Sequence, residues 1–178
     1  MPDNSLETFI KEKKQLKRKF SEKLSLSTKK ALVAIVLDKE LSKQDEQILL
    51  HILDGASRID VEVVVLADTN LRAIEAKNAK ILPYNRHNRE KILTAADMAI
   101  GFDFSDVEEM LLHGTIPISQ VRPEVEDYNP NRETGNSFIY KKSDHWCLFA
   151  ALVRALETFK FPYDWKNIVR QGIQSVKG

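Results

Sequence analysis

Two strongly apolar runs, ALVAIVL at residues 31–37 and VEVVVLA at residues 61–67, constrain the fold of this chain most. Apolar runs of this length, rich in β-branched residues, are typical of strands buried on both faces of a parallel sheet. Between them lies a helical pattern that begins at Ser42, ends at Gly55 and carries an apolar stripe. A strand–helix–strand unit of this kind predicts an α/β fold with a parallel sheet.

The same alternation continues to the end of the chain. Shorter strands are expected at 79–82, 97–102, 115–119 and 137–140, and helices at 88–95, 105–113, 143–156 and from Tyr163 onward. We therefore predict one Rossmann-like domain over residues 28–178, with a doubly wound parallel sheet of about six strands and helices on both faces. A length of 178 residues and a hydrophobic content of 43% suit a single domain with a substantial core.

Residues 1–27 form a basic lead-in to this domain. The first 30 residues hold nine Lys or Arg against four Asp or Glu, although the whole chain has a net charge of +1. Apolar residues at positions 9, 16, 20 and 24 recur at near-helical spacing, which predicts an amphipathic helix whose basic face is solvated. A nucleic-acid-binding arm is the alternative interpretation, but no base-stacking or base-reading pattern accompanies the lysines.

Several classes of protein are excluded or disfavoured by what the sequence lacks. No apolar run reaches the roughly 18 residues that a membrane-spanning helix needs, and no signal-peptide pattern is present, so a cytoplasmic protein is expected. A single cysteine, Cys147, excludes an internal disulfide framework, and we expect it to pack as a small apolar residue. The six glycines form no phosphate-binding loop and the four histidines have no metal-ligand spacing. We therefore expect neither a cofactor nor a metal.

The last two helices carry most of the aromatic residues. Ser143 is the expected N-cap of the first of them, in which Trp146, Phe149, Val153 and Leu156 form the expected core-facing stripe. In the last helix, Tyr163 and Trp165 are expected to be exposed or to meet a partner. Structural or surface roles are expected for three of the histidines, His51, His113 and His145; for His113 the expected role is an imidazolium that favours a helix C-terminus.

The candidate ligand site lies at the carboxyl ends of the strands, where open parallel sheets bind their ligands. The segments that follow the predicted strands there are 38–43, 67–70, 84–89, 101–106 and 119–122. Segment 84–89, YNRHNR, is the most suggestive polar cluster among them. In it, Arg86 and His87 are either contacts for an anion or nucleotide, or the solvated lead-in to a helix.

Several ordered motifs of the chain resemble the C-terminal half of bacterial glycogen and starch synthases. They run in sequence from the lysine-rich opening at 11–24, through AADM at 95–98, HGTIPI at 113–118 and DYNP…TGNSF at 127–138, to VRAL at 153–156. The resemblance implies the C-terminal domain of the GT-B fold, which binds the nucleotide sugar. It also implies glucosyl transfer from ADP-glucose or UDP-glucose to an α-1,4-glucan, with retention of configuration and without a metal.

The resemblance also implies where the donor would be held. The family places an arginine and a lysine against the leaving diphosphate, in the loop after the first strand, because negative charge develops there. Here Lys39 stands at the arginine position and Lys43 lies next to the lysine position. With Arg86, His87 and Arg122, these residues are the candidate donor-binding set, and a working site requires the cations among them to converge.

The chain also departs from the family pattern. The loops that hold the sugar and the phosphates are shorter, and the segment after residue 119 contains no glycine that would let the backbone approach a phosphate. The acceptor-binding half of the family is not in this sequence, so catalysis would need a separate partner domain. We therefore expect an isolated chain without activity. The alternative is a degenerate glycosyltransferase fold that serves as a protein-interaction or regulatory module.

Overall fold

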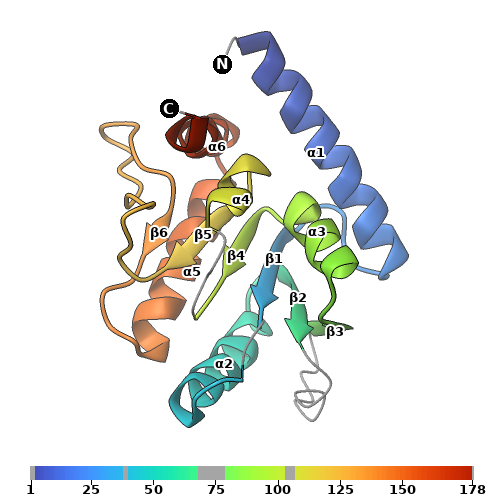
Figure 1. Ribbon diagram of the computed structural model, residues 1–178, viewed down its shortest axis with the longest axis vertical. Helices are drawn as coiled ribbons and strands as arrows, with labels where there is room; N and C mark the ends of the chain where they lie inside the picture. The colour runs from blue at the N-terminus through green and yellow to red at the C-terminus, as the bar shows by residue number, and fades with distance from the viewer. Residues whose placement is uncertain (1–2, 38–39, 68–78, 103–106, 178) are drawn as a thin grey trace.

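The computed structural model describes residues 3–37, 40–67, 79–102 and 107–177. In this part of the chain six strands form one all-parallel sheet in the order β3-β2-β1-β4-β5-β6 (Figure 1). The order reverses between β1 and β4, as in a doubly wound sheet, so the predicted fold class is confirmed. The strands are Ala31–Val36 (β1), Val61–Ala67 (β2), Ala79–Pro83 (β3), Met98–Ile100 (β4), Ile116–Ser119 (β5) and Phe138–Ile139 (β6).

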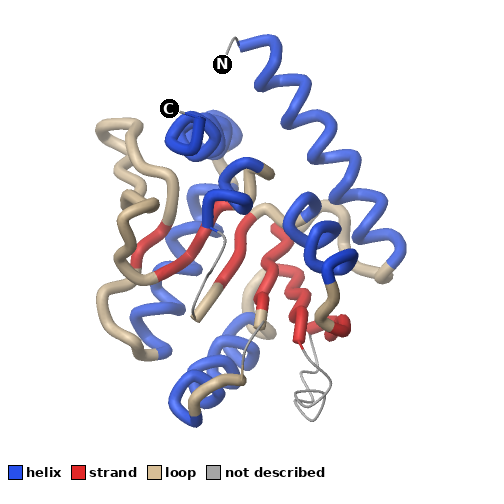
Figure 2. The backbone as a smooth tube through the Cα atoms, viewed as in Figure 1, coloured by secondary structure: helices blue, strands red, loops and turns tan. Residues whose placement is uncertain are grey.

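The continuous apolar run of β1 supplies two separate hydrophobic cores. Val33 and Ile35 pack with residues of α2, α5 and α6, whereas Leu32 and Ala34 on the other face pack with α3 and α4. Successive side chains of a strand point to opposite faces, so a strand between two helical layers must be apolar throughout. Figure 2 shows the strands lying between these helices. The helices are Asp3–Lys23 (α1), Lys43–Ala56 (α2), Arg86–Ala95 (α3), Val107–Leu112 (α4), His145–Phe159 (α5) and Pro162–Lys177 (α6).

The helix starts follow the local capping chemistry. Ser42 caps α2 by accepting a hydrogen bond from the Asp45 backbone N–H, as the sequence predicts. For α5 the prediction of Ser143 as N-cap is wrong, because Asp144 occupies that position and accepts from the Cys147 N–H at 2.8 Å. Ser105, at the start of the helix predicted over 105–113, lies outside the described residues.

The stripe by which α5 faces the sheet matches the predicted one only in part. Leu156 is buried and Phe149 packs partly against the core, as predicted, but Trp146 is 73% exposed. The buried residues of α5 are Leu148, Ala151, Leu152, Ala155 and Leu156. The two sets share Leu156 and both recur at helical spacing, because eleven of the fifteen positions of this helix are apolar. Periodicity alone therefore could not identify which of the two stripes faces the core.

Helix α1 crosses the amino-terminal ends of the strands, which we call the amino edge of the sheet. It packs on both helical layers. Near its start Leu6 is fully buried in the core formed with α2, α5 and α6, while Phe20 and Leu24 at its other end pack against the core formed with α3 and α4. Between these apolar contacts the helix presents Lys13 and Lys17 to the sheet edge. The prediction of a fully solvated basic face is therefore wrong for these two lysines.

Each of the two lysines satisfies polar groups that the amino edge leaves open. Lys17 Nζ lies 2.6 Å from a carboxylate oxygen of Asp97 and 2.7 Å from the Lys30 carbonyl oxygen. Lys13 Nζ donates to the Thr94 carbonyl, the His113 carbonyl and the Thr115 hydroxyl, at 3.2, 2.8 and 2.9 Å. Thr94 and His113 lie at the C-terminal ends of α3 and α4, where backbone carbonyls lack helical partners.

The same arrangement changes the expected state of His113. Burial, followed by the neighbouring Lys13 ammonium, lowers the pKa of His113 from its ordinary value. An imidazolium at the end of α4, as the sequence suggests, is thereby disfavoured. Lys13, which donates a hydrogen bond to the His113 carbonyl, serves this helix terminus instead.

Candidate functional site

The order of the strands places the candidate ligand site at the carboxyl ends of β1 and β4. Open α/β sheets bind ligands in the crevice where the strand order reverses, and this reversal lies between those two strands. The loop after β1 is described only from Glu40 onward, and the loop after β4 only through Phe102. The candidate Lys39 lies outside the described residues.

Lys43 is exposed and is the first residue of α2, directly after the Ser42 cap. The N-terminal end of a helix carries partial positive charge, which Lys43 reinforces. Two acids in the same turn, Asp45 and Glu46, counter that charge, and the Asp45 carboxylate accepts a hydrogen bond from the Ser42 hydroxyl at 2.7 Å. Burial, with a smaller contribution from Asp45, raises the pKa of the nearby Tyr140 phenol to about 12, so this phenol stays neutral.

Arg122 follows β5, on the other side of β4 from Lys43. Its guanidinium Nε lies 3.6 Å from a carboxylate oxygen of Glu124, and 27% of its side chain is exposed. Pro123 separates the two partners and fixes the backbone of a segment without glycine. An anion that approaches Arg122 therefore competes with the Glu124 carboxylate.

Arg86 and His87 stand at the opposite side of the carboxyl edge. They are exposed in the first turn of α3, which follows the outermost strand β3 and is capped by Asn85. At about 4.8 Å between neighbouring strands, the ends of β3 and β5 are about 19 Å apart. The backbone thus places Lys43 and Arg122 on either side of β4, and Arg86 and His87 two strands beyond β1.

Two further cations of the carboxyl edge were missed from the sequence. Lys141 and Lys142 are exposed and follow β6 after one intervening residue, Tyr140. Gln44 Nε2 donates to the Ser143 carbonyl at 3.1 Å, which joins this segment to the first turn of α2 and thus to the neighbourhood of Lys43. The signal that could have found them is their position immediately after the predicted strand at 137–140.

The motif residues of segment 127–138 form a rigid support beside this edge. Arg154 of α5 holds both carboxylate oxygens of Asp127, at 2.9 and 3.0 Å, and donates to the Ile139 carbonyl at 3.0 Å. Gly135 has a φ of +99°, and a Cβ there would lie 2.5 Å from the Asp127 carbonyl oxygen. The resemblance in this segment therefore has a structural basis in a bidentate ion pair and an obligatory glycine.

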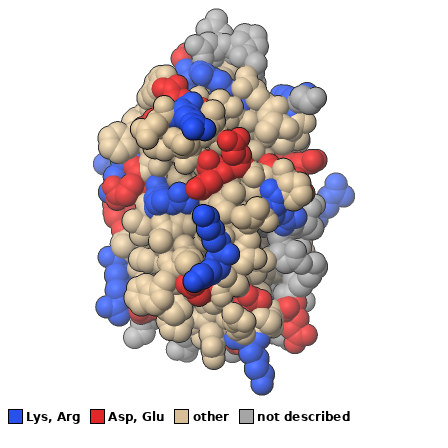
Figure 3. All heavy atoms as spheres, turned by 90° about the vertical axis from the view of Figure 1, so that its left-hand side faces the viewer, with Lys and Arg blue, Asp and Glu red and all other residues tan. Residues whose placement is uncertain are grey.

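The face that includes β6 and α5 carries basic and acidic side chains side by side (Figure 3). Among the described residues, no group of three or more His, Cys, Asp and Glu could hold a metal ion. No described helix is both long and apolar enough to cross a membrane. Cys147 is half-buried, and its pKa is raised by a hydrogen bond to the Asp144 carboxylate and by burial, which disfavours the thiolate.

Comparison with known proteins gives the same fold and a distant relationship. No family model matches the chain. The glycogen synthase of Desulfitobacterium hafniense is 24% identical over an alignment 187 residues long, gaps included, that covers 93% of this chain and 40% of that protein. The chain spans about two fifths of the length of the curated relatives it matches.

Solved structures show the same fold. The catalytic domain of starch synthase IV from Arabidopsis thaliana, bound to ADP and acarbose, matches 90% of this chain with a TM-score of 0.73 and 18% identity, over 38% of its own length. HepE of Anabaena, in complex with UDP and glucose, matches 92% of this chain with a TM-score of 0.68 and 13% identity, over 47% of its own length. The chain is a distant homologue of glycogen synthase, and its doubly wound sheet is a Rossmann-like domain of the GT-B type.

Proposed function

We propose that the chain is the nucleotide-sugar-binding half of a glycosyltransferase of the glycogen and starch synthase type. Its donor, ADP-glucose or UDP-glucose, binds at the carboxyl edge of the sheet, beside the ends of β1 and β4. The observation that carries the proposal is the match of almost the whole chain to part of a glycogen synthase, together with a sheet whose order reverses at that point.

The charges of the carboxyl edge support this proposal. Lys43 at the start of α2 and Arg122 after β5 flank the end of β4, and Lys142 lies close to the first turn of α2. Cations in this position oppose the negative charge that develops on a diphosphate as the bond to the sugar breaks. We include Lys39 in the donor-binding set, and we assign Arg86 and His87 to the outer part of the same edge.

Glucosyl transfer by this domain requires an acceptor-binding domain as its partner. Retaining transfer needs donor and acceptor held together with water excluded. The six-stranded sheet with its helices supplies one wall of such a cleft. We therefore propose that the 178-residue chain binds its donor but does not transfer glucose until an acceptor domain is supplied.

A second candidate function is a protein-interaction or regulatory module built on the same fold. The observation that favours it is the competition at the cations, since Glu124 is paired with Arg122 and the acids Asp45 and Glu46 follow Lys43. A carboxylate beside each cation weakens the attraction for a diphosphate. In this alternative the donor site is lost and the fold is kept for contacts with another protein.

Calorimetric titration with ADP, UDP, ADP-glucose and UDP-glucose at low salt tests the two candidates. The donor-binding proposal expects saturable binding that Lys43→Ala and Arg122→Ala each weaken by about tenfold, the effect of losing one charge-assisted hydrogen bond. Arg58→Ala is the matched control, because Arg58 is an exposed cation just beyond the other end of α2. An absence of binding at millimolar ligand contradicts the proposal and leaves the interaction module.

A further inference from the structure

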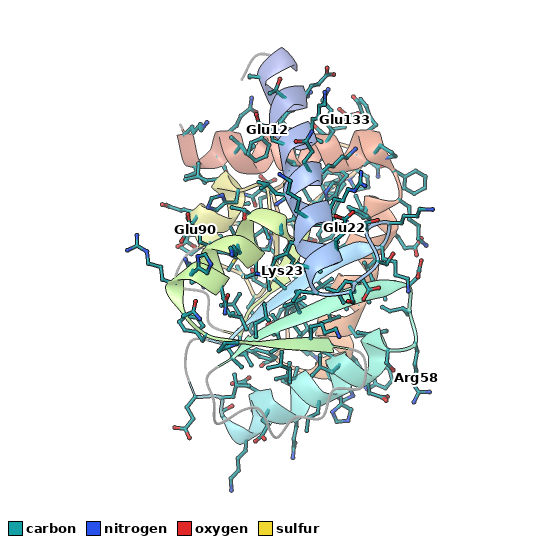
Figure 4. The ribbon with its side chains drawn as sticks, turned by 90° about the vertical axis from the view of Figure 1, so that its right-hand side faces the viewer. Glu12, Glu22, Lys23, Arg58, Glu90 and Glu133 are labelled. Carbon is teal, nitrogen blue, oxygen red and sulfur yellow. The ribbon has the colours of Figure 1, made fainter. Side chains whose placement is uncertain are left out.

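A cavity of about 400 Å³ opens at the amino edge of the sheet, opposite the candidate donor site. It is enclosed by α1, by the end of α5 and by α6, and its lining includes Asp97 just before β4 and Lys29 just before β1. Figure 4 looks onto α1, with Glu22 and Lys23 at its C-terminal end and α6 passing behind it. We refer to this cavity as the α1–α6 pocket. Its volume lies in the range of small-molecule sites.

Positive charge dominates the lining of the α1–α6 pocket. Asp97 is its one acid among the described residues, against the six cations Lys13, Lys14, Lys17, Arg18, Lys29 and Lys166. Three of the cations have carboxylate partners, since Lys17 pairs with Asp97, Arg18 with Glu22 and Lys166 with Glu7. Even with the two rim acids Glu7 and Glu22 included, the pocket keeps an excess of positive charge.

Of the three basic residues without a carboxylate partner, Lys13 donates to Thr94, His113 and Thr115, which leaves Lys14 and Lys29. Both are exposed, and within the described part of the chain no side-chain hydrogen bond or ion pair engages either ammonium group. They approach the pocket from two different segments, one from the middle of α1 and one from the turn before β1. Two unpaired cations at one cavity fit a ligand with a double negative charge better than a singly charged carboxylate.

The opposite wall is apolar and aromatic. Trp165 meets Phe159 edge to face at a ring-centroid distance of 5.1 Å and stacks on the buried Phe138 at 6.5 Å. Ile10, Pro162 and Val169 extend this wall. The three rings hold one another in place, so Trp165 presents a fixed apolar surface against which a flat ring can pack.

We propose that the α1–α6 pocket binds a small organic phosphate, namely a phosphate monoester carried on an apolar, ring-shaped group. The phosphate, which carries a charge of about −1.5 to −2 at neutral pH, is held by Lys14 and Lys29. The ring lies against Trp165 and Phe159. Because the pocket is at the amino edge and the donor site at the carboxyl edge, this ligand and a nucleotide sugar can be bound at the same time.

Phenyl phosphate is a suitable probe, and Trp165 is a built-in reporter. The chain has two tryptophans, and Trp146→Phe removes the other one, which is 73% exposed and lies on α5 at the opposite edge of the sheet. In that background, titration with phenyl phosphate at low salt is expected to change the Trp165 fluorescence saturably. Inorganic phosphate and benzyl alcohol, each carrying half of the recognised chemistry, are expected to bind at least about tenfold more weakly.

Charge reversal distinguishes the pocket from the general field of the basic helix. The pair Lys14→Glu and Lys29→Glu is expected to weaken phenyl phosphate binding by at least about tenfold. The control pair, Lys11→Glu and Lys19→Glu, changes the net charge equally at exposed positions of α1 outside the pocket lining, and a change below about twofold is expected. Three outcomes overturn the proposal. Both pairs of substitutions weaken phenyl phosphate binding equally, or binding does not saturate at 10 mM probe (about the weakest binding of interest), or inorganic phosphate binds with equal affinity.

The donor-site proposal is tested separately by the same titrations. Lys43→Ala lies at the other edge of the sheet and is expected to leave phenyl phosphate binding unchanged. A chain that binds phenyl phosphate but no nucleotide sugar retains the α1–α6 pocket and contradicts only the donor site. A chain that binds a nucleotide sugar and not phenyl phosphate contradicts only the pocket.

Discussion

Lys17 and Asp97 form a buried ion pair at 2.6 Å across 80 residues of sequence, with side chains only 9% and 10% exposed. The same carboxylate oxygen of Asp97 accepts the backbone N–H of Leu32 at 2.8 Å, and Lys17 also donates to the Lys30 carbonyl. The pair therefore fastens α1 to the starts of β1 and β4 at once. Leaving one charge of such a pair alone in the interior is costly, because its desolvation is no longer offset.

We expect Lys17→Met to lower the free energy of unfolding by about 3 kcal/mol, since it leaves the Asp97 carboxylate buried without its cation. The double variant Lys17→Met with Asp97→Asn is expected to be more stable than the sum of the single changes predicts. Urea denaturation of the four proteins gives the coupling energy. Additive effects would contradict the assigned role, and Arg18→Ala, which breaks an exposed pair of the same helix, is the control.

A pH-dependent stability is expected from Lys13. Burial lowers the pKa of Lys13 in the folded chain from 10.5 to about 7. The attraction of Asp97 opposes this shift, and the repulsion of Lys17 adds to it. Between those two pH values the unfolded chain binds more protons than the folded one, so the free energy of unfolding rises with pH. Denaturation at pH 7, 8 and 9 (values within this window) should show the rise in the wild type.

Lys13→Met is the matched variant for this measurement, because it removes the titrating group while keeping an unbranched side chain. It is expected to lack the rise in the free energy of unfolding between pH 7 and 9 (the window of the lysine). The pKa values of Tyr128 and Tyr140 are raised to about 12, chiefly by burial, so their titration lowers stability only at higher pH. Parallel pH profiles for the two proteins would show that Lys13 is charged throughout.

The chain's sheet could be predicted from its sequence because each strand carries its own evidence. The runs at 31–37 and 61–67 are apolar throughout, and this pattern depends only on burial on both faces. Lys17 and Asp97 had no such local signal, because an ion pair across 80 residues depends on where α1 crosses the sheet. The amphipathic pattern of α1 identified its apolar positions but did not distinguish its buried lysines from its exposed ones.

The sequence predicts where in the fold a candidate site would lie better than it predicts which residues come together there. Parallel strands bring their carboxyl ends to one edge, and Lys43 and Arg122 lie after β1 and β5 at that edge; their role in a site stays a prediction. The strand order was not readable from the sequence, and it is the order that puts Arg86 after the outermost strand. The pairing of Arg122 with Glu124 depends on the course of a loop, which no periodic pattern records.

Gly135 and Gly55 are expected to respond differently to the same substitution. At Gly135 an alanine Cβ would meet the backbone of Asp127 at 2.5 Å, in a residue with a φ of +99°. Gly135→Ala should therefore lower the free energy of unfolding by at least about 2 kcal/mol. At Gly55 the Cβ meets only the Phe149 ring at 2.6 Å, and alanine improves the helix, so a change within about 1 kcal/mol is expected in thermal or urea unfolding. Similar losses at both positions would contradict this assignment.

The two tryptophans provide a test of which face of the C-terminal helices is structural. Trp165 packs against Phe138 and Phe159, so Trp165→Ala is expected to lower the free energy of unfolding by about 3 kcal/mol through a cavity in the core. Trp146 is 73% exposed, and Trp146→Ala should change the free energy of unfolding by less than about 0.5 kcal/mol. Urea unfolding monitored by far-ultraviolet circular dichroism compares the two without relying on the fluorescence that the substitutions remove. If Trp146→Ala destabilised the chain more than Trp165→Ala, the predicted stripe through Trp146 would be the face of α5 that packs on the sheet.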